Sequence, residues 1–86
     1  DLLDVRWQEG RLAGRSRIVG GDPYDIYITE PAGFVFDKAT CDGAQLSGAL
    51  REGAQSGSAA REGALVKITC RADASREIGW TATFRR

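Results

Sequence analysis

Apolar and polar residues alternate with a period of two at the start of the chain, a pattern typical of a half-buried β-strand. Leu3, Val5 and Trp7 fall on one face of this predicted strand, with charged residues between them. The segment Gln8-Glu9-Gly10-Arg11 then predicts a tight turn, followed by a second strand from Leu12 to Val19. We therefore expect the chain to open with a β-hairpin.

The same alternation recurs along the chain and is interrupted by turn residues about every eight to twelve residues. Segment 24–29 is the clearest strand, and the turn Glu30-Pro31-Ala32-Gly33 ends it. Further strands are predicted from Phe34 through Cys41, ended by the Asp42-Gly43 turn, and then from Ala44 to Leu50, from Leu65 to Cys70 and from Ile78 to Phe84. About seven strands of this kind predict an all-β fold, namely an antiparallel β-sandwich of immunoglobulin-like or jelly-roll-like type.

Residues 51–63 differ from the rest of the chain because they are polar and small, with the run Gln55-Ser56-Gly57-Ser58-Ala59-Ala60 at their centre. This composition predicts a long hairpin loop. A helix from Leu46 to Ala60 is the alternative, since alanine is common there. It is disfavoured because glycines interrupt the segment, and each costs up to about 1 kcal/mol in a helix.

With 86 residues, the chain is long enough for one small domain with one hydrophobic core. We therefore expect residues 1–86 to form a single sandwich. The chain contains no methionine and begins at Asp1. These features indicate a domain cut from a larger protein.

Composition lowers the rank of several functions. Twelve basic residues balance twelve acidic ones, so no net charge attracts nucleic acid or an anionic membrane. No stretch approaches the roughly 20 apolar residues that a membrane span requires. The chain also lacks histidine, the most frequent general base and a common metal ligand. We therefore expect neither an enzyme nor a bound cofactor, and neither nucleic acid nor membrane as a partner.

The two cysteines, Cys41 and Cys70, fit no metal-binding spacing. Two interpretations stay open. A disulfide between them would close a loop of about 30 residues, contribute about 3 to 4 kcal/mol to stability and imply an oxidising compartment. Alternatively, both are buried thiols that pack as small apolar residues.

Carboxylates are the remaining candidates for chemistry. Asp22 and Asp25 lie close together in sequence, but Asp22 precedes Pro23 and is typical of a turn former. Asp22, Asp37 and Asp42 could converge on a calcium ion, although the chain has no Asp-x-Asp-x-Asp-Gly loop. We therefore predict no metal site.

Aromatic residues matter because sugar-binding modules expose flat rings. Trp80 shares a face with Ile78, Ala82 and Phe84, and this predicts a core position in which the indole N–H finds a partner. Trp7 is likewise predicted to lie in the core, because it shares a face with Leu3 and Val5. Tyr27 lies opposite two isoleucines in the alternation and is the best candidate for an exposed ring.

The first hairpin carries a family resemblance. Val5-Arg6-Trp7-Gln8-Glu9-Gly10-Arg11-Leu12, followed by Ile18-Val19-Gly20-Gly21, resembles the Trp-x-x-Gly-x-Leu opening of C-terminal β-sandwich domains in bacterial glycoside hydrolases, with fucosidase-type enzymes nearest. The resemblance covers about a quarter of the chain. It implies a domain that packs against a catalytic domain and carries no catalytic residues.

Two functions follow as hypotheses. The first is a non-catalytic accessory domain of a secreted or periplasmic carbohydrate-active enzyme, which stabilises or orients the neighbouring catalytic domain and exposes an apolar patch when alone. The second is a carbohydrate-binding module that binds a polysaccharide, with Tyr27 and either Trp7 or Tyr24 as the stacking platform and with Asp25 or an arginine bonded to sugar hydroxyls. A third function, protein adhesion or subunit contact through an exposed strand edge, is not distinguished from the first by the sequence, because any sandwich can pair through its edges.

Overall fold

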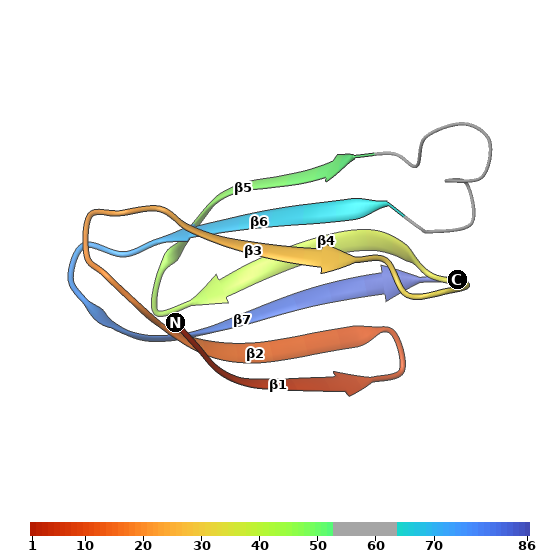
Figure 1. Cartoon of the computed structure of the whole chain (residues 1–86), viewed down its shortest axis with the longest axis horizontal. Helices are drawn as coiled ribbons and strands as arrows, with labels where there is room; N and C mark the ends of the chain where they lie inside the picture. Colours follow the sequence, from red (N-terminus) through yellow and green to blue (C-terminus); the bar gives the residue numbers. More distant parts are fainter. Residues whose placement is uncertain (53–63) are drawn as a thin grey trace.

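A computed structural model describes residues 1–52 and 64–86, and all its regular structure is β-strand. The strands are β1 (Leu2–Gln8), β2 (Arg11–Ile18), β3 (Tyr24–Thr29), β4 (Val35–Asp42), β5 (Gln45–Glu52), β6 (Leu65–Arg71) and β7 (Arg76–Arg85) (Figure 1). The predicted all-β fold and its strands are confirmed. Most of the predicted 51–63 loop lies outside the described residues.

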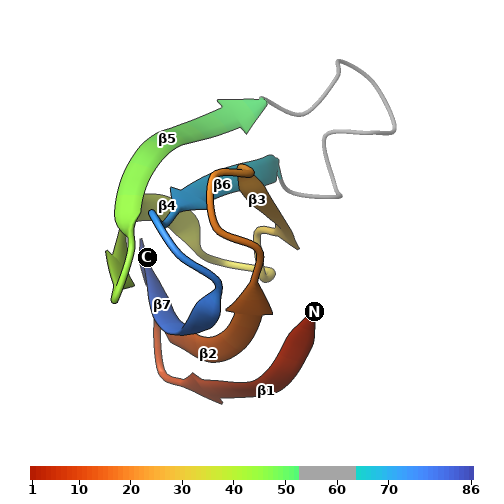
Figure 2. The ribbon, with the colours of Figure 1, turned by 90° about the vertical axis from the view of Figure 1, so that its left-hand side faces the viewer.

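The strands form two antiparallel sheets packed together as a sandwich (Figure 2). Sheet A has the order β1-β2-β7-β4, and sheet B has the order β3-β6-β5. In an immunoglobulin constant domain the fifth strand lies beside the second, and the seventh lies in the other sheet. Here β7 takes the place beside β2 and β5 lies in the other sheet, so the strand order differs from the immunoglobulin one.

The first hairpin forms as predicted, with β1 and β2 joined by Glu9 and Gly10. Both residues have positive φ angles, 28° and 82° respectively. Two consecutive positive φ angles characterise the type I′ turn, whose twist matches that of the flanking strands. Glycine adopts this conformation at no steric cost, which explains its place in the turn.

The core consists of the inward-facing residues of the two sheets, and the period-two pattern of the sequence identifies most of them. The buried apolar residues of the strands are Ile18, Ile26, Ile28, Ala39, Val66, Ile68, Cys70, Ile78, Trp80, Ala82 and Phe84. Trp80 is only 3% exposed, and its Nε1–H donates to Ser16 Oγ at 3.1 Å. The predicted core position of Trp80 and the partner for its indole N–H are confirmed.

The prediction for Trp7 was wrong. Trp7 is 42% exposed, and Val5 is 44% exposed, because β1 lies at the edge of sheet A, beyond the three strands of sheet B. A bulge between Leu2 and Asp4 also shifts the register, so Leu2 pairs with buried Ser16 while Leu3 is left out of the ladder. Leu2, not Leu3, therefore shares the inner face with Val5 and Trp7.

Cys41 and Cys70 form a disulfide with a Cα–Cα distance of 6.1 Å. Cys41 lies on β4 and Cys70 on β6, so the bridge joins sheet A to sheet B. The disulfide interpretation of the two cysteines is therefore confirmed, and the alternative of two buried thiols is wrong. The turn between β4 and β5 crosses between the sheets on the same side, and this side of the sandwich is therefore closed covalently.

Candidate interaction surface

The side of the sandwich opposite the disulfide is open. Sheet A ends there in β1 and sheet B ends in β3, whereas β4 and β5 form the closed side (Figure 2). Tyr24 on β3 bonds to Ser16 on β2 at 3.0 Å, so β3 lies opposite β2. Strand β1 therefore extends beyond sheet B, and within the described residues its inner face has no strand opposite it.

This overhang exposes an apolar strip on β1 made of Leu2, Val5 and Trp7. Their exposed fractions are 56%, 44% and 42%, although all three are on the inner side of sheet A. Scattered exposed apolar residues are common on protein surfaces, but apolar residues gathered on one face indicate an interaction site. We call these three residues the β1 strip.

A groove of about 420 Å³ lies between β3 and two residues of the β1 strip, Leu2 and Val5. Every residue of β3, from Tyr24 to Thr29, lines it, together with Leu2 and Val5 from β1 and the core residues Leu12 and Trp80. The groove thus follows the whole length of the free edge of β3. Its other wall is formed by Leu2 and Val5 of β1.

Trp7 lies at one end of the open side, where its ring is held by other aromatic residues. The Trp7 and Phe34 ring centroids are 5.3 Å apart in an edge-to-face arrangement, and those of Trp7 and Phe84 are 5.9 Å apart. The Arg86 guanidinium lies 4.7 Å from the centre of the Phe34 ring. These contacts orient the indole while leaving much of it accessible.

The four predicted sugar-binding residues do not form one platform. Tyr27, 60% exposed, and Asp25 lie on the outer face of sheet B, because they alternate with buried Ile26 and Ile28. Asp25 accepts a bond from Thr69 Oγ1 at 2.7 Å and lies 4.0 Å from Lys67 Nζ.

The other two predicted residues are on the inner side of the sandwich. Tyr24 is half-buried, and its hydroxyl donates to Ser16, so its O–H proton is already used within the domain. Trp7 belongs to the β1 strip and stands on the other sheet. The structure thus brings together Tyr27 and Asp25, but neither Tyr24 nor Trp7 joins them on that face.

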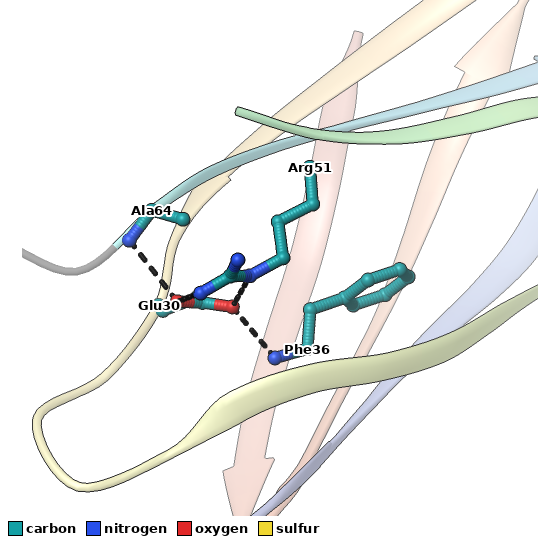
Figure 3. Close-up of polar contacts among 4 residues, drawn as sticks. All are labelled: Glu30, Phe36, Arg51 and Ala64. Carbon is teal, nitrogen blue, oxygen red and sulfur yellow. Dashed lines mark hydrogen bonds and ion pairs between the residues drawn. The ribbon is translucent and has the colours of Figure 1, made fainter. Parts of the chain in front are cut away.

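Glu30 is a buried polar residue that sequence reasoning assigned only to a turn. Its side chain is 3% exposed and accepts four bonds (Figure 3). Arg51 donates through Nε at 2.6 Å and Nη2 at 3.0 Å, and the backbone N–H groups of Phe36 and Ala64 donate at 2.7 and 3.0 Å. We call these four residues the Glu30 clamp.

The bonds from Arg51, helped by the two backbone N–H groups and opposed by burial, lower the pKa of Glu30 from 4.5 to about 2. The carboxylate therefore stays charged at neutral pH and is fully paired. A signal for it was present in the sequence, because Glu30 continues the inward-facing parity of Ile26 and Ile28. Both carboxylate oxygens of Glu30 accept bonds from the domain itself, so we assign the clamp a role in stability.

Within the residues that the structure describes, no three His, Cys, Asp or Glu side chains gather as metal ligands. Asp22, Asp37 and Asp42, considered for calcium, are not brought together there. In the same residues no helix is long and apolar enough to cross a membrane.

Comparison of the chain with family models, curated proteins and solved structures finds no match.

Proposed function

We propose that this chain is a non-catalytic accessory domain that stabilises or orients the catalytic domain beside it in a secreted or periplasmic carbohydrate-active enzyme. The observation that carries the proposal is the β1 strip, because covering such an apolar face with a neighbouring domain lowers the free energy. The disulfide fits an oxidising compartment. The carbohydrate-active context rests on the Trp7 to Leu12 hairpin motif.

The test is a pair of variants in the parent chain. Leu2→Ser with Val5→Ser makes the β1 strip polar, and neither residue belongs to the buried core of this domain. Leu50→Ser is the matched control, because Leu50 is 62% exposed and lies on β5, away from the open side. We expect only the first variant to lower the melting temperature of the catalytic domain and to speed proteolysis between the domains. Identical behaviour of the two variants would rule the proposal out.

A carbohydrate-binding module is the second candidate, favoured by the exposed ring of Tyr27 beside Asp25 on the outer face of sheet B. An exposed ring and a hydrogen-bonding carboxylate can stack on and orient a sugar. A screen of polysaccharides and glycans on the isolated chain, followed by fluorescence titration of any hit, tests this function. A saturable signal that is lost in Tyr27→Ala favours the module. A silent panel with folded protein favours the accessory domain.

A further inference from the structure

We propose that the free edge of β3 accepts an extended, alternately apolar strand from the neighbouring domain, and that this strand becomes the fourth strand of sheet B. The inference rests on the proposed accessory function and names the kind of segment that covers the open side. Main-chain pairing with an edge strand is a known way of binding an extended segment.

The strand count of the two sheets supports this assignment. Sheet A has four strands and sheet B has three, and the Tyr24–Ser16 bond sets β3 opposite β2. Strand β1 follows β2 at the edge of sheet A, whereas no described strand follows β3 at the edge of sheet B. A strand added beside β3 would fill that place and cover the β1 strip.

The edge of β3 also differs from the other sheet edges in the described part of the chain. Edge strands β1, β4 and β5 each carry a register irregularity, at Leu2/Asp4, Phe36/Lys38 and Leu46/Gly48 respectively. Bulges of this kind hinder the addition of another strand. Strand β3 pairs with β6 in continuous register over all six residues and contains neither lysine nor proline. Its edge is therefore the one best suited to accept a strand.

The walls of the groove define the chemistry of the occupant. On the β3 side, the main chain of an edge strand offers unpaired N–H and C=O groups, which only another extended main chain can satisfy in series. On the β1 side, the wall consists of Leu2 and Val5, with Leu12 and Trp80 at the base. Every second side chain of the added strand must therefore be apolar, and the residues between them face solvent.

The size of the β1 strip favours a tethered strand over a second copy of the chain. Three side chains that are about half exposed present on the order of 300 Å² of apolar surface, whereas a stable interface buries about 800 Å² on each partner. A small contact becomes stable when its two halves belong to one polypeptide, because the effective concentration is high. The neighbouring domain of the parent chain meets this condition.

The experiment compares amide hydrogen exchange along β3 in the isolated chain and in the parent chain, with Trp7 fluorescence quenching as a separate readout of docking. We expect alternate amides of β3 to exchange at least about tenfold more slowly in the parent chain, with Trp7 shielded from quencher. Shielding of Trp7 with unchanged exchange along β3 would overturn the strand addition and leave the accessory function standing. If neither changes, both proposals fail.

Two further controls make the result specific. Val5→Lys places a charge on the groove wall and should return β3 exchange in the parent chain to the rate of the isolated chain. Leu50→Lys on β5 should leave the protection intact. If the isolated chain gains the same β3 protection as its concentration rises, the occupant is a second copy, and the assignment to a neighbouring domain is overturned.

Discussion

At the scale of single residues, two small residues on β2, Gly14 and Ser16, lie against Trp80, the largest side chain of the core. Trp80 pairs with Gly14 across sheet A, and its indole lies where a Cβ atom on Gly14 would be. Ser16, which is 0% exposed, accepts bonds from Trp80 on its own sheet and Tyr24 on the opposite one. The buried hydroxyl therefore links the two sheets next to the indole.

Gly14→Ala should destabilise the domain by more than about 2 kcal/mol, because the new methyl group overlaps the Trp80 ring in a closely packed core. Urea unfolding followed by tryptophan fluorescence measures the change. Gly48→Ala is the matched control, since a Cβ atom there meets nothing within 4 Å. The control should be neutral or stabilise by up to about 1 kcal/mol. Equal effects of the two substitutions would contradict this account of Gly14.

At the scale of elements, the Glu30 clamp ties together segments that are distant in sequence. Glu30 follows β3, Phe36 belongs to β4, Arg51 to β5, and Ala64 precedes β6. A carboxylate at this point satisfies two backbone N–H groups and a guanidinium at once (Figure 3). The ends of four strands thus depend on one ionised group.

The clamp predicts a defined loss of stability in acid. The folded-state pKa of Glu30 is about 2, below its ordinary value of 4.5, so the stabilisation is complete above about pH 4.5 and is lost as the pH falls toward 2. We expect Glu30 to account for about 2 kcal/mol of this loss, allowing for the partial exposure of Arg51. Urea unfolding at a series of pH values measures it.

Glu30→Gln should remove this part of the pH dependence and lower stability at pH 7 by about 3 kcal/mol, since the guanidinium of Arg51 loses its buried partner. Glu77→Gln is the control, because Glu77 pairs with Arg15 at 2.8 Å and both side chains are exposed. Its effect should stay below about 1 kcal/mol. A pH profile of Glu30→Gln that matches the unsubstituted chain would refute the role of the clamp.

The strands could be predicted because alternation is a local property of the sequence. Trp80 shares a face with Ile78 and Ala82, and this pattern alone identified a buried face. The same pattern failed for Trp7, because burial on β1 depends on how many strands the opposite sheet has. The bulge that replaces Leu3 by Leu2 on the inner face is likewise invisible to a strict period of two. The candidate surface therefore emerged only from strand pairing, which a single sequence does not contain.

At the scale of the whole molecule, the sandwich has one side closed by a covalent bond and one side lined by apolar residues that none of the described strands covers. The Cys41–Cys70 bridge holds β4 to β6 on the first side. On the second, Tyr24 on β3 bonds to Ser16 on β2, and β1 lies beyond them at the edge of sheet A. Because a small domain buries a modest share of its surface on folding, a covalent link between its two sheets adds appreciably to its stability.

The disulfide should therefore contribute a large share of the stability of the isolated domain. It spans 29 residues in sequence, and a loop of this length corresponds to about 3 to 4 kcal/mol on the chain-entropy model. We expect the reduced chain, kept in excess dithiothreitol, to unfold at a markedly lower urea concentration than the oxidised chain.

The control is the double variant Cys41→Ala with Cys70→Ala. It should lose slightly more stability than the reduced chain, because Cys70 is 0% exposed and its truncation also leaves a small cavity. Dithiothreitol should not change the unfolding midpoint of the double alanine variant. This control separates loss of the disulfide from other effects of the reductant. Oxidised and reduced chains with the same unfolding midpoint would show that packing alone joins the two sheets.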